Sequence, residues 1–185
     1  MRAKNYGESL LLMLDVADEL NNLKIPYLLI GAAAVSVYGV PRASLDADAV
    51  IQIEKEDKNK LCGALKKKGL LAEVRKGGFD DPISMVIKVT DKYGNRIDLL
   101  SGIRSIKHDV FSLAKKVKFK KSTLDIAAAE DLIVMKALAG SYQDIEDIKG
   151  IIQVQGKKLN RNLLRKIIAG YGKRVQKKIN SLFLK

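Results

Sequence analysis

The chain has 185 residues, of which 47% are hydrophobic and 30% are charged. This composition supplies enough apolar side chains for a packed core and argues against a disordered chain. No apolar run approaches the roughly 20 residues that a membrane-spanning helix needs, and the first eight residues lack the pattern of a signal peptide. The single Cys and single His exclude an intrachain disulfide and a zinc cluster, so we expect a cytoplasmic protein without a membrane partner.

The net charge of +13 is unevenly distributed along the chain. From residue 148 to residue 185 there is no Asp or Glu, whereas eleven residues are Lys or Arg. A basic surface of this kind can bind the phosphate backbone of a nucleic acid, and it indicates RNA as a partner. A solvent-exposed, lysine-rich helical surface without a partner is the simpler alternative.

Apolar periodicity and turn residues predict an alternation of helices and strands over the first 127 residues. In chain order, these are a helix at 8–23, a strand at 27–30, a helix at 32–38 opened by Gly31, a strand at 47–53, a helix at 55–68, strands at 70–74, 84–90 and 96–100, a helix at 105–115, and short edge strands at 117–119 and 124–126. The turn between the strands at 84–90 and 96–100 contains a glycine, which is typical of a hairpin.

From Ala129 onward the sequence predicts only helices, the first ending at Gly140 and the others at 143–154, 160–171 and 173–182. We therefore expect an α/β domain over residues 1–127, with a small mixed sheet of four to five strands backed by helices. A helical C-terminal subdomain over residues 128–185 is expected to complete a cleft with it.

Two carboxylates, Asp46 and Asp48, lie two residues apart at the second predicted strand. Side chains alternate along a strand, so both point to the same face. Two carboxylates beside apolar residues are unfavourable unless a cation lies near them. Oxygen ligands suit Mg²⁺, which also takes ligands from substrate phosphates. The pair therefore predicts metal-dependent chemistry on a nucleotide.

Five short motifs occur in an order that resembles the polymerase-β-like nucleotidyltransferase superfamily, most closely its small AbiEii-like branch with the toxin-type enzymes. The motifs are Ile30-Gly31-Ala32, residues 41–48 ending in Asp-Ala-Asp, Arg96-Ile97-Asp98-Leu99-Leu100, residues 129–136 ending in Lys136, and Asp144-Ile145-Glu146-Asp147-Ile148. Each motif alone is weak, but five in the expected order are specific. The resemblance spans residues 27–151.

The resemblance implies a nucleotidyltransferase-like α/β fold and an enzyme that uses Mg²⁺ or Mn²⁺. Such an enzyme transfers an NMP from an NTP to an acceptor hydroxyl on RNA, protein or a small molecule, and releases pyrophosphate. The three aspartates Asp46, Asp48 and Asp98 are the implied metal ligands and catalytic residues, with Asp98 activating the attacking hydroxyl. Nucleotidyl transfer depends mainly on positioning and charge neutralisation.

The resemblance also implies a set of nucleotide-binding residues: Gly31, Ala32, Arg42, Ser44, Lys136, Asp144 and Asp147. Gly31 lets the backbone approach a phosphate at a helix start, and Lys136 supplies a cation for the triphosphate. Asp144 and Asp147, one helical turn apart, orient Lys136 or the acceptor. Ala32 departs from the Gly or Ser that is common in the family, so weaker phosphate binding is expected.

Simpler roles stay open for these residues. Asp98 and Arg96 can form a plain hairpin ion pair, Lys136 can extend from an apolar helix to solvent, and Arg42 can contact a phosphate or only close its loop. For the whole chain, the alternative to an enzyme is a catalytically degenerate module of the same fold that binds nucleic acid or a partner protein. A role in a toxin–antitoxin pair concerns biology rather than chemistry and stays open too.

Overall fold

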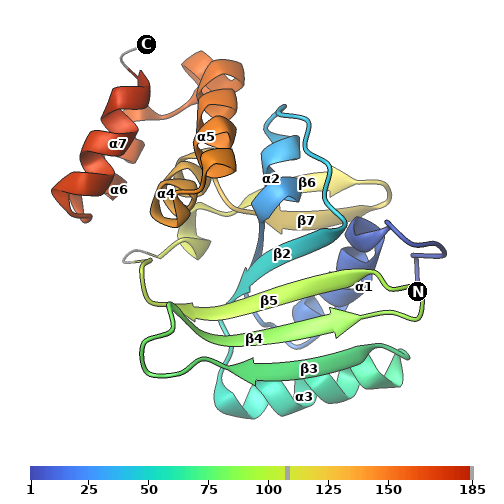
Figure 1. The fold of residues 1–185 in the computed structure, drawn as a ribbon. Helices are drawn as coiled ribbons and strands as arrows, with labels where there is room; N and C mark the ends of the chain where they lie inside the picture. The colour runs from blue at the N-terminus through green and yellow to red at the C-terminus, as the bar shows by residue number, and fades with distance from the viewer. Residues whose placement is uncertain (107–108, 184–185) are drawn as a thin grey trace.

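The structure is a computed structural model of the chain and describes residues 1–106 and 109–183. Its centre is a seven-stranded mixed sheet in the order β3-β4-β5-β2-β1-β7-β6 (Figure 1). The strands are β1 (Tyr27–Ile30), β2 (Asp46–Ile51), β3 (Leu71–Lys76), β4 (Ile83–Thr90), β5 (Arg96–Ile103), β6 (Lys115–Phe119) and β7 (Ser122–Ile126). The expected α/β class is confirmed, although the sheet is larger than the four to five strands expected.

The pairing of the strands joins segments that are distant in the sequence. β2 lies parallel to β5, and β1 lies parallel to β7, while the other neighbours are antiparallel. β7 was expected at an edge, but it lies between β1 and β6, and β6 forms that edge instead. The β4–β5 turn is held by Asp91, whose Oδ1 accepts hydrogen bonds from the backbone N–H groups of Tyr93 (2.8 Å) and Asn95 (3.0 Å).

The helices lie on different sides of the sheet. They are α1 (Ser9–Asn22), α2 (Gly31–Val37), α3 (Lys55–Lys67), α4 (Ala129–Ala139), α5 (Tyr142–Gln155), α6 (Arg161–Ala169) and α7 (Lys173–Phe183). Figure 1 shows α1 and α3 behind the strands, whereas α4 to α7 gather together beside α2. Over the described residues, no helix combines the length and apolarity needed to cross a membrane.

Alternation along the central strands separates a buried face from an accessible face. Ala47, Ala49, Ile97 and Leu99 are each at most 2% exposed, on the face covered by α1. Burial of a large aliphatic side chain contributes about 1.5–3 kcal/mol, so this pattern fixes which face of β2 and β5 is the core. The residues between them, including both aspartates of β2, therefore lie on the opposite face.

The prediction of a helix at 105–115 is wrong for the residues of that segment that the structure describes. Residues 107–108 lie outside the described residues. The Asp109 carboxylate accepts a hydrogen bond from the Phe111 backbone N–H (2.9 Å), and the Ser112 hydroxyl donates to the Asp109 carbonyl (2.8 Å). Such local bonds compete with the helical pattern. The segment instead forms one 3₁₀ turn at Phe111–Leu113, and β6 begins at Lys115.

Candidate active site

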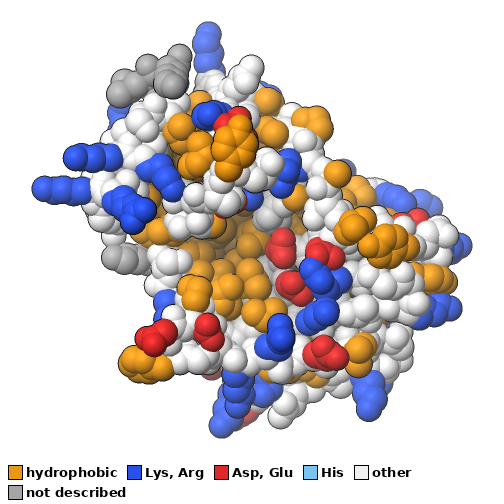
Figure 2. All heavy atoms as spheres, in the orientation of Figure 1, with side chains coloured by type: hydrophobic (Ala, Val, Ile, Leu, Met, Phe, Trp, Pro, Cys, Tyr) orange, Lys and Arg blue, Asp and Glu red, His pale blue; other side chains and the backbone are white. Residues whose placement is uncertain are grey.

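The accessible face of β2 and β5 brings the three predicted aspartates onto one surface. In the parallel register, Asp48 lies directly opposite Asp98, and Asp46 lies opposite Arg96. Residues opposite one another in a ladder share a face, so the three carboxylates and the guanidinium lie together. In the same orientation as Figure 1, Figure 2 shows acidic and basic side chains grouped beside a hollow lined with hydrophobic side chains.

The Arg96 guanidinium lies among these carboxylates. Its Nη2 donates a hydrogen bond to Asp46 Oδ2, and its Nε lies 3.8 Å from Asp98 Oδ2. The ion pair between Arg96 and Asp98, one of the alternatives that the sequence allows, is therefore present. Arg96 also pairs with Asp46. Within the described residues, no three His, Cys, Asp or Glu side chains are placed together as a ready-made metal site. A guanidinium takes the position of a cation beside Asp46 and Asp98.

The environment of Asp48 disfavours its negative charge. Burial raises the pKa of its carboxyl group, and the charges of Asp98 and Asp46 raise it further, with partial compensation from Arg96 and Lys136. A nearby divalent cation would reverse this effect. The donor set consists of carboxylate oxygens on one face, which is the ligand type that Mg²⁺ and Mn²⁺ prefer. The three carboxylates therefore match such an ion in the type of their donor atoms, and Arg96 would have to move away for the ion to bind.

Gly31 holds the start of α2 against this carboxylate. Its φ is +66°, and a Cβ atom at this position would lie only 2.5 Å from Asp48 Oδ2. Only glycine combines this conformation with this close approach. The preceding residue, Ile30, lies opposite Asp48 in the β1–β2 register. Ala32 follows at the start of the helix, where its carbonyl accepts a hydrogen bond from the Ser36 hydroxyl (3.1 Å).

A second charged cluster connects α4, α5 and the loop before β2. Lys136 Nζ lies 2.9 Å from both Asp144 Oδ1 and Asp147 Oδ2, and Arg42 Nε lies 3.2 Å from Asp147 Oδ1. The Asp147 side chain is only 1% exposed, so it holds both cations in a buried position. This geometry agrees with the idea that the Asp-x-x-Asp pair orients Lys136, and it shows that Arg42 closes its loop onto α5.

The cluster favours the charged forms of Lys136 and Asp144. Burial alone lowers the pKa of Lys136, but hydrogen bonds to Asp144 and Asp147 outweigh it, so that the pKa is raised overall. Burial likewise opposes ionisation of Asp144, but hydrogen bonds from Lys136 and Ser141 hold the pKa of this carboxyl below its ordinary value. Asp144 also closes a capping box with Ser141 at the start of α5, which fixes the position of this helix end.

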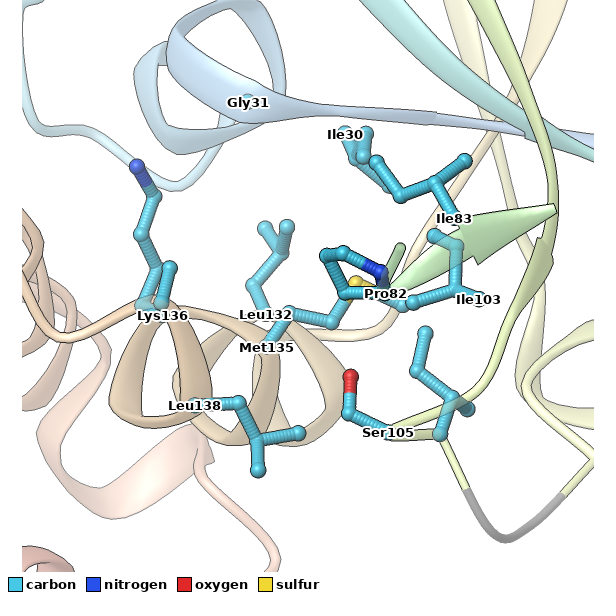
Figure 3. Close-up of a pocket in the computed structure, with 12 residues that line it drawn as sticks. Ile30, Gly31, Pro82, Ile83, Ile103, Ser105, Leu132, Met135, Lys136 and Leu138 are labelled. Carbon is cyan, nitrogen blue, oxygen red and sulfur yellow. The ribbon is translucent and has the colours of Figure 1, made fainter. Parts of the chain in front are cut away.

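An apolar pocket of about 500 Å³ opens between α4 and the strand ends, next to the aspartates. Figure 3 shows the Lys136 side chain extending from α4 toward Gly31, while Leu132 and Met135 face Ile30 across the cavity. The remaining lining residues come from the start of β4 with the residue before it, the end of β5 with the segment after it, and the end of α4; they are Pro82, Ile83, Ile103, Ser105, Ile106, Leu138 and Ala139. Sequence analysis missed this pocket because its walls come from four separate segments.

The structure does not bring all the predicted nucleotide-binding residues together. Ser44 is exposed and lines a different hollow of about 300 Å³, which it shares with Arg42 and Asp46. Its hydroxyl accepts a long hydrogen bond from the Asp46 backbone N–H (3.4 Å). Gly31 and Lys136 line the apolar pocket, whereas Asp46 lines only the other hollow.

Comparison with known protein families identifies the family of this chain. The profile of the family described as "Nucleotidyl transferase of unknown function (DUF2204)" matches residues 73–182, more than half of the chain. The chain belongs to this family. The matched part of the chain contains Asp98, Lys136, Asp144 and Asp147, whereas Gly31, Asp46 and Asp48 precede it. The nucleotidyltransferase superfamily inferred from the sequence motifs is thereby confirmed, whereas the AbiEii-like branch stays a prediction.

Solved structures of nucleotidyltransferase-like proteins share the fold over most of the chain. An antigenic nucleotidyltransferase-like protein from Paracoccidioides brasiliensis is 18% identical, with a TM-score of 0.60 over 97% of this chain and 89% of that chain. A putative nucleotidyltransferase from Thermotoga maritima is 14% identical, with a TM-score of 0.60 over 81% of this chain and 96% of that chain.

The antibiotic-resistance factor ANT(2″)-Ia, solved in complex with adenylyl-2″-tobramycin, is 11% identical, with a TM-score of 0.60 over 89% of this chain and 99% of that chain. At these identities the similarity establishes the fold. No protein with curated annotation matches the chain.

Proposed function

We propose that the protein is a nucleotidyltransferase that uses Mg²⁺ or Mn²⁺ to move an NMP from an NTP to an acceptor hydroxyl, with release of pyrophosphate. The observation that carries this proposal is the β2–β5 register, which sets Asp48 beside Asp98 with Asp46 on the same face, in a member of a nucleotidyl transferase family. Divalent ions bound by these carboxylates would neutralise the developing charge on the attacking and leaving oxygens.

The residues of the chain have separate tasks in this proposal. Asp98 accepts the proton of the acceptor hydroxyl, whose oxygen forms a bond to the α-phosphorus as the bond to the β-phosphate oxygen breaks. Lys136, held by its two aspartates, faces the phosphates beside Gly31, whose missing side chain lets the start of α2 lie against Asp48. The apolar pocket receives the nucleoside, because aliphatic side chains suit the flat faces of a base. Helices α4 to α7 complete this cleft as a C-terminal subdomain.

RNA is the acceptor that the charge distribution favours. Helices α6 and α7 bury Leu164, Ile168 and Ile179 and present exposed basic residues, including Arg165 and Lys177, on the other side. The absence of acidic residues after residue 147 leaves this surface positive throughout. Phosphate contacts of this kind make binding strongly salt-dependent.

Labelled nucleotides test the activity and the acceptor together. The protein is incubated with each α-labelled NTP, Mg²⁺ or Mn²⁺ and total cell extract, and the label is followed into RNA, protein or small products. We expect transfer that falls at least about hundredfold in Asp48→Asn and Asp98→Asn, whereas Glu56→Gln, an exposed substitution on α3, leaves it unchanged. Full transfer by either aspartate variant would contradict the proposal.

A binding module of the same fold is the second candidate, and the Arg96–Asp46 contact is the observation that favours it. An arginine that stays in place would exclude metal from the site. Titration with Mg²⁺–NTP separates the two, because a ligand of the native state must raise the melting temperature. No shift with any NTP, together with salt-sensitive RNA binding, would favour the module.

A further inference from the structure

The position of Arg96 is unusual because its cationic group lies where the proposed function places a metal ion. Arg96 lies opposite Asp46 in the β2–β5 register, so its guanidinium reaches both carboxylates. Its Nη2 atom donates a hydrogen bond to Asp46, and its Nε atom faces Asp98. Arg96 is thus a tethered monovalent cation shared by two of the three carboxylates.

The fit of the guanidinium to this position is incomplete. Its Nε atom is buried and has no hydrogen-bond partner among the described residues, and 3.8 Å from Asp98 Oδ2 is too long for a hydrogen bond. Arginine forms its strongest pairs as two parallel hydrogen bonds to one carboxylate, which this arrangement lacks. A buried donor without a partner is unfavourable, so the side chain is held here mainly by charge.

The surroundings allow the side chain to leave while the backbone stays fixed. The Arg96 backbone N–H donates a hydrogen bond to the Ser9 hydroxyl (3.1 Å), and strands β2 and β4 pair with this residue on both sides. The side chain itself is 38% exposed, next to carboxylates that are 34% (Asp46) and 27% (Asp98) exposed. Rotation of its side-chain bonds therefore carries the guanidinium into solvent without disturbing the sheet.

We propose that Arg96 is a built-in competitor of the divalent cation: its guanidinium holds Asp46 and Asp98 in the metal-free protein, and the ion binds only when it is displaced. This inference rests on the proposed function, since it takes the three aspartates as the metal ligands. Two consequences follow from the competition. The carboxylates keep their orientation without metal. The apparent metal affinity equals the intrinsic affinity multiplied by the fraction of molecules in which Arg96 has moved away.

Metal binding, measured without any turnover, tests the competition. The free Mn²⁺ signal in electron paramagnetic resonance gives the dissociation constant for the wild type, Arg96→Gln and Lys88→Gln. Lys88 is the matched control, because it lies opposite Asp98 on β4 and its loss removes the same charge from the same face. We expect Arg96→Gln to bind Mn²⁺ about fivefold more tightly than the wild type, as for one partly exposed ion pair, and Lys88→Gln to change by less than about twofold.

The outcomes separate this inference from the function on which it rests. Equal affinities for Arg96→Gln and Lys88→Gln, with Mn²⁺ still bound, would overturn the role of Arg96 and leave the metal site intact. Failure of all three proteins to bind Mn²⁺ would overturn both.

A measurement on the wild type covers the case in which Arg96→Gln does not fold. In ¹⁵N spectra of arginine side chains, the Arg96 Nε–H signal should move toward that of a solvated arginine as Mg²⁺ is added. A signal that is unchanged at saturating Mg²⁺ would refute the displacement.

Discussion

Replacement of Gly31 by alanine tests the close approach of α2 to Asp48. The left-handed conformation at φ +66° disfavours alanine by about 1 kcal/mol. The added Cβ atom would also lie 2.5 Å from Asp48 Oδ2, so the carboxylate or the helix start must shift. Overpacking of this kind adds about 1–2 kcal/mol. We expect a total loss of about 2–3 kcal/mol, or a melting temperature about 5–10 °C lower for a chain of this length.

Two other glycines separate the two contributions. Gly69 also has a positive φ, of +77°, but nothing lies within 4 Å of the position of its Cβ atom, so Gly69→Ala measures the backbone strain alone. Gly63 lies inside α3 with the same open space and an ordinary helical conformation. Alanine is the better helix former, so Gly63→Ala should stabilise the protein by up to about 1 kcal/mol.

Urea unfolding of the three variants and Mn²⁺ binding are the assays. Because the Asp48 carboxylate or the helix start beside it must shift in Gly31→Ala, we expect this variant alone to lose at least about tenfold in Mn²⁺ affinity. A Gly31→Ala protein that is no less stable than Gly69→Ala and binds Mn²⁺ normally would refute the reasoning, because the contact with Asp48 would then have no consequence.

Three further substitutions test other parts of the site. Asp48 has a raised pKa in the folded protein, so its ionised form destabilises the fold above that pKa and has no effect below the unfolded value of about 3.9. Metal-free Asp48→Asn should therefore need more urea to unfold than the wild type at pH 7, and the gap should vanish as the pH falls below about 4; an equal gap at both pH values would contradict this. Asp147→Asn removes the charge of a buried carboxylate that pairs with two cations, so it should lower the free energy of unfolding by about 3 kcal/mol. Glu146→Gln breaks only an exposed pair with Lys149 and should change that free energy by less than about 0.5 kcal/mol in the same urea titration. Met135→Glu places a charge in the apolar pocket and should weaken NTP binding, measured by calorimetry, about tenfold. Val154→Glu, at an exposed site on α5, should leave NTP binding unchanged. Equal NTP affinities of the two variants would contradict the assignment of this pocket to the nucleoside.

Local patterns in the sequence predicted the order and type of most elements. β1 was expected with the bounds that it has, and α1, α3 and β4 differ from expectation by one or two residues. These elements have clear apolar periodicity, which depends only on neighbouring residues. The segment at 105–115 failed because a single side chain, Asp109, forms turn hydrogen bonds that periodicity does not register.

The site required information that the sequence does not contain in local form. The shared face of Asp46 and Asp48 follows from their spacing, but the position of Asp98 opposite Asp48 depends on a parallel pairing between strands fifty residues apart. The same holds for Arg96: its spacing from Asp98 places both on one face, yet its contact with Asp46 exists only through the register.

The two edges of the sheet have a consequence for the protein in concentrated solution. β6 carries three exposed lysines, Lys115, Lys116 and Lys118, and β3 at the other edge ends in exposed Arg75 and Lys76. An edge strand offers unpaired backbone groups to any other strand, and like charges repel a second copy that would add there. We therefore expect these cations to act as gatekeepers that disfavour fibril-like stacking and the addition of a further strand at either edge.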